Sequence, residues 1–399
     1  MSGKKQKQLR KINQKTLRVF WNSNAMFSMS GYGQQMAELL PLIRDDGYPL
    51  AICNFFGQEG TKFMLDGILN YPKINHVYGG DAMIHHARDF NADVVFTLQD
   101  VWVLNPQDLQ QVNRWIPYIP IDHEPIPRVV AEKLKYAYRV VAMSKFGQEE
   151  LKKKGIASTY IPHMVDTTIF KPQDKAQIKK NAGFSPDTFI LGMVAANKDN
   201  PPRKSFQEVL DAFKMFKEKV PNSILYIHTN PDFPGGFPIK EYAEFIGILG
   251  SVFFPEPYQL SFNTTKEGMS KIYNAMDVFL MPSFSEGFGI GFIEAQACGI
   301  PVIGNNFTSM KELVKVGKTG YLTDVASKRF SQLGSYIAVP STQSIFDSLM
   351  KIYNGDREKM GIEARKFMLE EYDSKVVYET KWKPFLAQLQ KEIYPSNEK

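Results

Sequence analysis

The chain has 399 residues, of which 43% are hydrophobic and 23% charged, a composition that excludes a disordered protein and leaves room for two domains. No apolar run reaches the ~18 residues that span a bilayer, and the N-terminus lacks the apolar core of a signal peptide. We therefore expect a cytoplasmic protein. Cys53 and Cys298 lie in apolar segments and are interpreted as two buried thiols, which excludes a disulfide framework.

Part of the net charge of +6 lies at the N-terminus, where Lys and Arg recur as far as Arg18 without an acidic residue between them. A basic tail of this kind can contact anionic lipid or nucleic acid. It lacks aromatic residues that would stack on bases, and it has few apolar residues for an amphipathic anchor. We interpret residues 1–16 as a solvated, flexible tail, with peripheral contact to a membrane as the alternative.

Short apolar runs alternate with amphipathic stretches along the rest of the chain, which is typical of parallel sheets crossed by helices. In the first half the expected strands are 17–21, 49–56, 92–98, 114–122, 138–144 and 159–165. The expected helices between them are 33–47, 81–90 and 145–155. In the second half the expected strands are 189–197, 223–230, 251–257, 277–283 and 301–306, with helices at 206–220, 267–276 and 291–299.

This order predicts an α/β protein with two doubly wound, Rossmann-like domains that face each other across a cleft. We expect the first domain over 17–168, a polar linker over 169–187 and the second domain over 188–376. The last helix, 377–399, is expected to cross back to the first domain. Ligands of such sheets bind outside the carboxyl ends of the strands, so the residues after each strand are the candidates for a site.

The most informative of these turns is "FSEGFGIGFIEAQ", between a buried strand and a helix. Gly287, Gly289 and Gly291 let the backbone approach a ligand closely, and the free N–H groups of the helix start suit a diphosphate. Glu286 precedes the helix, and Glu294 lies about one turn inside it, where its carboxylate can accept hydrogen bonds from two ribose hydroxyls. Taken alone, the glycines are equally consistent with a turn that only packs tightly.

The two glutamates, separated by seven residues around Gly-Phe-Gly, resemble the signature of glycosyltransferase family 4 (group 1). Three further strings are similar to the family in the same order: "VDTTIFKP" (165–172), "KIYNAMDVFLMPS" (271–283) and "GKTGYL" (317–322). The resemblance implies the GT-B fold and transfer of a hexose from a UDP- or GDP-sugar with retention of configuration. It places Glu286 at the donor sugar and Glu294 at the ribose.

The resemblance also implies that the turn residues Gly287, Phe288, Gly289 and Ile290 contact the donor. A departing nucleoside diphosphate needs cations, and the turn "NKDNPPRKS" after the first strand of the second half supplies them. Lys204, with Arg203 beside it, fits the family's lysine. The family's arginine is missing, because its position falls on Asn197 or Lys198. A solvated basic turn is the alternative.

In the first domain, Gly31 and Gly33 stand in the first strand-to-helix turn, where the family has a glycine loop that faces the donor. His123 follows a strand, and the resemblance implies that it contacts the donor sugar. The triplet Asp122-His123-Glu124 also resembles a D-x-E site for Mg²⁺ or Mn²⁺. We expect no required cofactor and no metal site, because cationic side chains can stabilise the leaving group.

The sequence does not identify the acceptor, which can be a glycan, a lipid-linked molecule, a nucleic acid or a small molecule. It also leaves the oligomeric state open. Two other functions are compatible with the sequence. One is a nucleotide-sugar epimerase of the GT-B type, and the other is a non-catalytic protein that binds nucleic acid or membrane through its basic tail. The epimerase would interconvert its donor without any acceptor.

Overall fold

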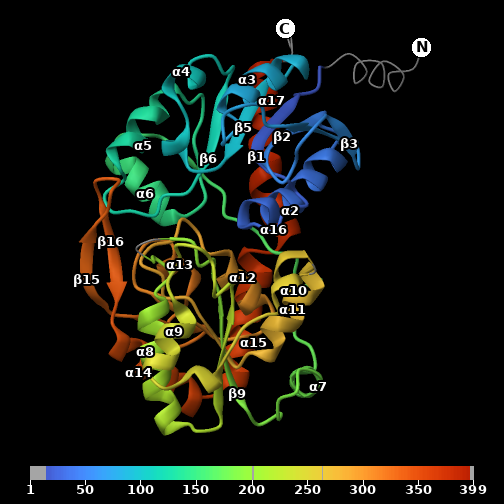
Figure 1. Ribbon diagram of the computed structural model, residues 1–399. Helices are drawn as coiled ribbons and strands as arrows, with labels where there is room; N and C mark the ends of the chain where they lie inside the picture. Colours follow the sequence, from blue (N-terminus) through green and yellow to red (C-terminus); the bar gives the residue numbers. More distant parts are fainter. Residues whose placement is uncertain (1–14, 200–201, 263, 396–399) are drawn as a thin grey trace.

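The computed structural model describes residues 15–199, 202–262 and 264–395. Most of the basic tail expected over residues 1–16 therefore lies outside the described residues. Two α/β domains lie one above the other in Figure 1, each with its own sheet. We call the part with strands β1–β8 the first domain and the part with strands β9–β16 the second domain. Among the described residues, no helix has the length and apolar character needed to cross a membrane.

The first sheet has the order β3-β4-β2-β1-β5-β6-β7-β8, and its strands are parallel except for the antiparallel pair β3 and β4. Its strands are β1 (Val19–Asn24), β2 (Leu50–Phe56), β3 (Phe63–Leu65), β4 (Ile68–Pro72), β5 (Val94–Leu98), β6 (Trp115–Ile119), β7 (Val141–Ala142) and β8 (Thr159–Tyr160). Buried side chains alternate between its two faces: Val19 and Trp21 belong to one apolar cluster, and Phe20 to another. Helices therefore cover both faces.

The helices of the first domain begin where the sequence offers caps. The Ser30 side chain accepts from Gly33 N at the start of α2, and the Ser144 side chain accepts from Gly147 N at the start of α6. The helices are α2 (Gly31–Asp45), α3 (Gly80–Asp89), α4 (Pro106–Leu109), α5 (Arg128–Lys133) and α6 (Lys145–Lys153), with 3-10 turns η1 (Val101–Val103) and η2 (Leu134–Tyr136). Helix α2 packs on one face of the sheet, and α3 and α5 on the other.

The second sheet is parallel, with the order β11-β10-β9-β12-β13-β14. Its strands are β9 (Phe189–Val194), β10 (Ser223–His228), β11 (Val252–Phe253), β12 (Val278–Leu280), β13 (Val302–Asn305) and β14 (Gly320–Thr323). Its helices are α7 (Lys175–Asn181), α8 (Phe206–Lys219), α9 (Ile239–Phe245), α10 (Pro257–Phe262), α11 (Lys266–Ala275), α12 (Ile290–Ala297), α13 (Met310–Leu313), α14 (Thr342–Asn354) and α15 (Arg357–Glu371), with the 3-10 turn η3 (Leu249–Ser251). Both doubly wound domains confirm the fold class expected from the alternating pattern.

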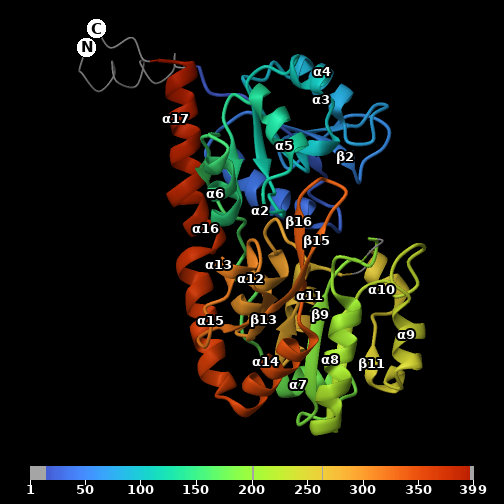
Figure 2. The same cartoon turned by 90° about the vertical axis from the view of Figure 1, so that its left-hand side faces the viewer.

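A hairpin that the sequence pattern did not predict follows β14. Its strands, β15 (Val325–Phe330) and β16 (Tyr336–Pro340), are antiparallel and rise from the second domain towards the first (Figure 2). The backbones of Tyr336 and Glu124 exchange two hydrogen bonds of 3.0 and 3.1 Å, and Lys328 Nζ donates to Glu124 Oε2 at 2.7 Å. The hairpin thus joins the second domain to the loop that carries His123.

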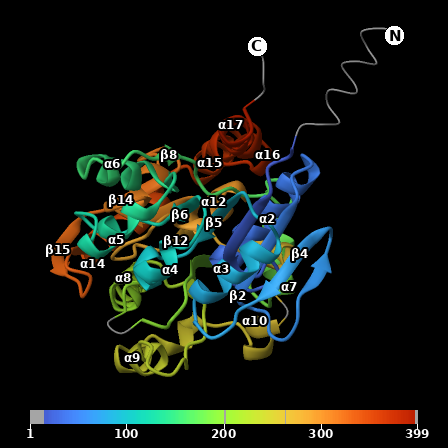
Figure 3. The same ribbon diagram turned by 90° about the horizontal axis from the view of Figure 1, so that it is seen from above.

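The end of the chain returns to the first domain, as expected. It runs through α16 (Ser374–Val377), the π-helical turn η4 (Tyr378–Trp382) and α17 (Lys383–Ile393) along one side of the molecule (Figure 2). Trp382 is buried against the aromatic rings of Trp21, Phe96 and Tyr118 in the first domain. Seen from above in Figure 3, α17 lies at the opposite edge of the molecule from α9 and α10.

Candidate active site

The turn that carries the two glutamates joins β12 to α12 at the carboxyl edge of the second sheet. Glu286 is 6% exposed, and hydrogen bonds hold its backbone on both sides: Thr308 Oγ1 accepts from Glu286 N at 3.2 Å, and Ser309 Oγ donates to Glu286 O at 2.9 Å. The next residue faces the other domain, because a Cβ on Gly287 would lie 2.4 Å from Pro120 Cβ. Glycine is therefore required here for the two domains to approach each other.

The cationic turn between β9 and α8 meets Glu286 directly. Lys204 Nζ forms a short hydrogen bond and ion pair with Glu286 Oε1, and Arg203 Nη1 lies 3.6 Å from the same oxygen. Arg203 Nη1 also donates to Ser285 O at 2.9 Å. These three side chains come from turns next to neighbouring strands, β9 and β12, at the switch point of the second sheet.

Their protonation states follow from this pairing. Burial raises the pKa of the Glu286 carboxyl, but Lys204 and Arg203 outweigh burial and hold that pKa below its usual range. Burial and the charge of Arg203 lower the pKa of Lys204 against the pull of Glu286. Burial also opposes the charge of Arg203, yet Glu286 and nearby aspartates raise its pKa. We infer a charged, preorganised cluster.

Glu294 lies inside α12, away from this charged cluster. Tyr273 Oη donates to Glu294 Oε2 at 2.7 Å, and the carboxyl is 7% exposed. Burial raises the pKa of Glu294 to about 7, although the Tyr273 hydrogen bond works against this rise. A carboxylate can accept further hydrogen bonds besides the one from Tyr273, and a ribose hydroxyl is a donor of that kind.

The start of α12 faces the first glycine turn across the domain interface. A Cβ on Gly31 would lie 3.2 Å from Ile290 Cδ1, so the N-terminal ends of α2 and α12 approach each other. Gly289 has φ of +107° and caps α12, which explains a glycine there without any ligand. Gly33 has a packing reason as well, since a Cβ would lie 2.3 Å from Ser28 Oγ. Phe288 packs against the ring of His163 of the first domain, with ring centroids 5.0 Å apart.

Asn197 and Lys198 differ sharply in what their side chains do. Both amide atoms of Asn197 are used: Nδ2 donates to Phe237 O at 2.9 Å, and Oδ1 accepts from Phe237 N at 2.8 Å. The Asn197 side chain therefore holds the loop after β10, and its contact with the donor stays a prediction. Lys198 is exposed, and its charge acts on Asp100 of the first domain.

His123 lies where the sequence placed it, after β6, and is 7% exposed. Its Nδ1 is 2.6 Å from Asp122 Oδ1, which fixes the ring orientation. Glu124 points elsewhere and pairs with Lys328 of the hairpin, so the three residues of the D-x-E triplet do not converge. In the part of the chain that the structure describes, no group of three His, Cys, Asp or Glu side chains is arranged to hold a metal ion.

Sequence reasoning missed Asp100, which follows β5 and is partly exposed at the domain interface. Burial and the charge of Asp122 raise the pKa of Asp100 to about 6, while Arg203, Lys198 and His123 oppose this rise. The missed signal was its position directly after the strand "VVFTL".

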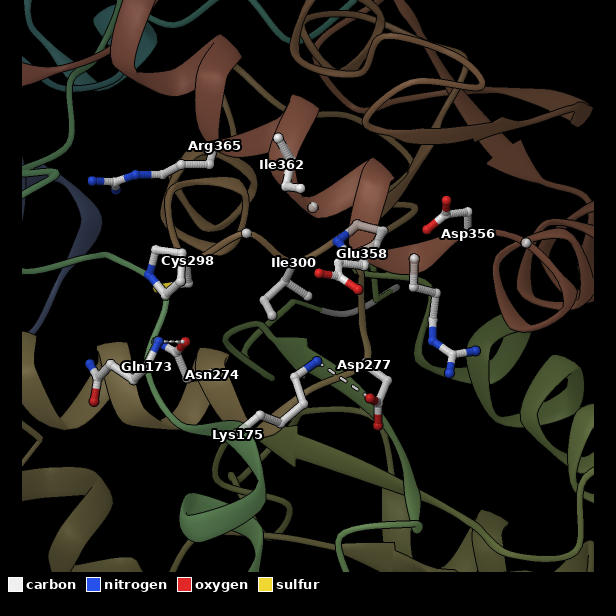
Figure 4. Close-up of a pocket in the computed structure, with 16 residues that line it drawn as sticks. Gln173, Lys175, Asn274, Asp277, Cys298, Ile300, Asp356, Glu358, Ile362 and Arg365 are labelled. Carbon is white, nitrogen blue, oxygen red and sulfur yellow. Dashed lines mark hydrogen bonds and ion pairs between the residues drawn. The ribbon is translucent and has the colours of Figure 1, made fainter.

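A cavity of about 580 Å³ lies apart from this site (Figure 4). It is lined by the linker after Pro172, the turn after Cys298 and helix α15, and Lys175 pairs with Asp277 at its wall. None of the expected site residues lines it. The chemistry is therefore to be sought at the domain interface, where the charged groups converge.

Comparison with known proteins finds a family match in the part of the chain that carries Glu286, Glu294 and the cationic turn. Residues 174–333 match the family described as "Glycosyl transferases group 1". The chain is 23% identical over 232 residues to an N-acetyl-alpha-D-glucosaminyl L-malate synthase of Bacillus anthracis, covering 57% of this chain and 53% of that relative. It is 30% identical over 165 residues to a D-inositol 3-phosphate glycosyltransferase of Rhodococcus jostii, covering 40% of this chain and 34% of that relative. The chain thus spans about half or less of the length of these curated relatives.

Solved structures share the whole architecture. Sucrose-phosphate synthase from Thermosynechococcus elongatus superposes with a TM-score of 0.73 at 15% identity, covering 94% of this chain and 99% of the other. Anabaena HepE in complex with UDP and glucose superposes with a TM-score of 0.67 at 13% identity, covering 93% and 100%. These likenesses establish the GT-B fold. The family match itself is confined to residues 174–333, most of which lie in the second domain.

Proposed function

We propose that the protein transfers a hexose from a UDP- or GDP-sugar to an acceptor hydroxyl and retains the anomeric configuration. The observation that carries the proposal is the charged cluster of Glu286, Lys204 and Arg203 at the switch point of the second sheet, where the next residue, Gly287, faces the first domain. The family match over residues 174–333 and the names of the chain's relatives support a glycosyltransferase activity. The solved complex of HepE with UDP and glucose supports a nucleotide-sugar donor.

The roles of the residues follow from their charge and position. Lys204 and Arg203 stabilise the diphosphate, together with the N-terminal end of α12 beyond Gly289. Glu286 and His123 hold the donor sugar from the two domains. Glu294 accepts hydrogen bonds from the ribose. Lys198 adds positive charge from the exposed side of the turn.

The transfer step fits a front-face reaction. The acceptor oxygen forms a bond to the anomeric carbon on the face from which the phosphate leaves. The bond between that carbon and the phosphate oxygen breaks, and its electron pair stays with the diphosphate. The acceptor proton moves to the departing phosphate oxygen. Retention then needs no enzymic nucleophile, and the cations of the second domain stabilise the charge that develops.

Positive side chains around the diphosphate suggest that transfer needs no added cofactor. Arg203 and Lys204 already place two cations beside Glu286 at the expected position of the leaving group. We expect the transfer rate to be the same with EDTA as with added Mg²⁺ or Mn²⁺. A rate that falls with EDTA and returns with a divalent cation would contradict this assignment.

The proposal is tested first by finding the donor. A ligand that binds the folded state raises the melting temperature, so UDP, GDP, ADP and their sugars are compared by thermal shift. The best donor is then incubated alone. A transferase gives at most slow hydrolysis, whereas an epimerase interconverts the sugar without an acceptor. Proton NMR of the first transfer product reports its anomeric configuration, and inversion would contradict retention.

A further inference from the structure

The first domain has a switch point of its own, to which no function has yet been assigned. The chain leaves β1 towards β2 and β4 on one side of the sheet and returns to β5 on the other side. In open α/β sheets ligands bind outside the carboxyl ends of the strands at this point. In the second domain the same position holds Glu286, Lys204 and Arg203. The polar groups at the carboxyl ends of β1 and β5 therefore need an explanation.

Asn24 and Gln99 stand side by side at these strand ends. Asn22 of β1 pairs with Thr97 of β5, and Ser23 Oγ donates to Leu98 O at 3.0 Å, which continues the alignment by one residue. Gln99 is 2% exposed, and among the described residues neither of its amide atoms has a hydrogen-bond partner. The same holds for Asn24 Oδ1, whereas Asn24 Nδ2 donates to Ser30 Oγ at 2.7 Å.

Unpartnered buried polar atoms are costly, at about 1–3 kcal/mol each. Several of them at one switch point indicate that their partners arrive with a ligand. Asp100 extends the group towards the domain interface. No hydrogen bond or ion pair engages its carboxylate within the described ranges, although the charges of Asp122, Arg203 and Lys198 all reach it. It thus lies between the amides of the first domain and the cationic turn of the second.

We propose that Asn24, Gln99 and Asp100 form the acceptor site and bind a neutral, polyhydroxylated acceptor, a sugar or a cyclitol, through its hydroxyl groups. This inference rests on the proposed transferase function. Amides both donate and accept, and a carboxylate accepts from two hydroxyls at once, which matches the hydroxyl pairs of such molecules. The carboxylates of Asp100 and Asp122 repel an acceptor that places a phosphate or carboxylate against them, and the nearby Arg203 and Lys198 offset part of this repulsion.

Two exposed rings that lie near these residues along the chain fit the same class of acceptor. Phe27, in the loop after Asn24, is 47% exposed, and Trp102, shortly after Asp100, is 42% exposed. Aromatic faces of this kind can pack on the apolar C–H face of a sugar ring while its hydroxyls bind elsewhere. A free sugar and the terminal sugar of a larger glycan present the same hydroxyls, so the site accommodates either.

The test uses the full chain with the donor found by thermal shift. Acceptor-dependent release of nucleoside diphosphate is measured with methyl α-glucoside, methyl α-mannoside and myo-inositol, and with glucose 6-phosphate as the anionic probe. Maltotriose separates a glycan end from a free monosaccharide. We expect at least one neutral polyol to stimulate release, at ten times or more the kcat/KM of glucose 6-phosphate.

Variants then locate the effect. Asp100→Asn should raise the KM of the acceptor about tenfold or more, while the Kd of the nucleoside diphosphate changes less than twofold. Gln99→Leu distinguishes an effect on acceptor binding from an effect on folding. It removes a buried amide that has no partner among the described residues, so it takes no hydrogen bond from the ligand-free protein. It should leave Tm unchanged or raised, and still raise the acceptor KM several-fold. Asp45→Asn, a change at an exposed position at the end of α2, is the matched control. It should change neither the KM of the acceptor nor the Kd of the nucleoside diphosphate.

The outcomes separate the two proposals. If no nucleotide or nucleotide sugar binds, the proposed function fails. If the donor binds but no neutral polyol stimulates release, or glucose 6-phosphate is preferred, the acceptor assignment is overturned and the transferase proposal stands. An Asp100→Asn variant that weakens nucleotide binding and leaves the acceptor KM unchanged also overturns it.

Discussion

The switch points of the two domains are built in opposite ways. In the second domain the buried carboxylate of Glu286 is paired with Lys204 and lies near Arg203. In the first domain Gln99 and Asn24 keep amide atoms without partners, and Asp100 has no ion pair among the described residues. The difference suggests that the donor side is organised before any ligand binds, whereas the acceptor side obtains its hydrogen bonds from the ligand.

The largest expected effect comes from breaking the ion pair between Lys204 and Glu286 in the second domain. Lys204→Met removes the nearest cation from the buried Glu286 carboxylate and leaves Arg203, 3.6 Å away. Removing one partner of a buried ion pair costs about 3–5 kcal/mol of folding free energy. Loss of a preorganised charge should lower the transfer rate about 10²–10³-fold. Urea unfolding and steady-state kinetics measure the two effects.

The double variant Lys204→Met/Glu286→Gln is the control for this change. It removes the stranded charge, so most of the folding stability should return while the transfer rate stays low. Glu286→Gln alone should also be strongly impaired in transfer. If the single lysine variant were as stable as the parent protein, the pair would not be what organises this turn.

A smaller effect is expected at Glu294, whose burial raises its pKa to about 7 from the ordinary value of 4.5. The carboxylate form accepts from ribose hydroxyls, so nucleotide affinity should rise several-fold between pH 6 and pH 8. Glu294→Gln should remove this pH dependence, and Glu294→Ala should weaken binding about tenfold. Isothermal calorimetry at several pH values measures both, and unaltered affinity in the alanine variant would count against the ribose assignment.

The same pKa predicts a stability profile for the ligand-free protein. Between pH 4.5 and 7 the folded state keeps a proton on Glu294 that the unfolded chain has released, so stability falls as the pH rises through this range. Glu294→Gln lacks this titration. Its Tm relative to the parent protein should therefore increase from pH 5 to pH 8, and a constant difference would show that Glu294 ionises normally.

The smallest effect concerns the cations of the β9–α8 turn. Lys198 is exposed, so Lys198→Ala should weaken donor binding only about two- to fivefold, and the difference should shrink in 0.5 M salt. Arg203→Met, in the same turn, removes a half-buried guanidinium that lies beside Glu286, and should weaken donor binding about tenfold or more at either salt concentration. If Lys198→Ala weakened donor binding more than Arg203→Met, Lys198 would be the residue that replaces the family's arginine.

The sequence predicted the fold well because the two sheets depend on local alternation of apolar and polar stretches. The expected strand at 277–283 and the helix from 291 are found as β12 and α12 at nearly the same places. It also predicted that Glu286 and Lys204 belong to one region, since both follow strands of one sheet. Their roles in binding the donor stay predictions.

The rest depended on contacts that spacing does not reveal. Asn197 is bound to the backbone of Phe237, forty residues along the chain, and nothing in the turn itself signals this. Asp100 gains its significance only from residues of the other domain. Strand β15 of the hairpin is charged and mostly exposed, so it lacks the buried apolar pattern by which most strands of the two sheets were predicted.

The two segments that connect the domains run together. Val165 N donates to Tyr372 O at 2.9 Å, and Ser374 N donates to Val165 O at 3.0 Å, so the outgoing and returning chains form a short two-stranded ribbon. Two covalent connections that share one ribbon act mechanically as a single pivot. Rotation about that pivot is the motion they leave free, while sliding or separation of the domains would have to break the ribbon. Opening about this pivot would also have to break the two backbone hydrogen bonds between Tyr336 and Glu124, which join the hairpin to the first domain.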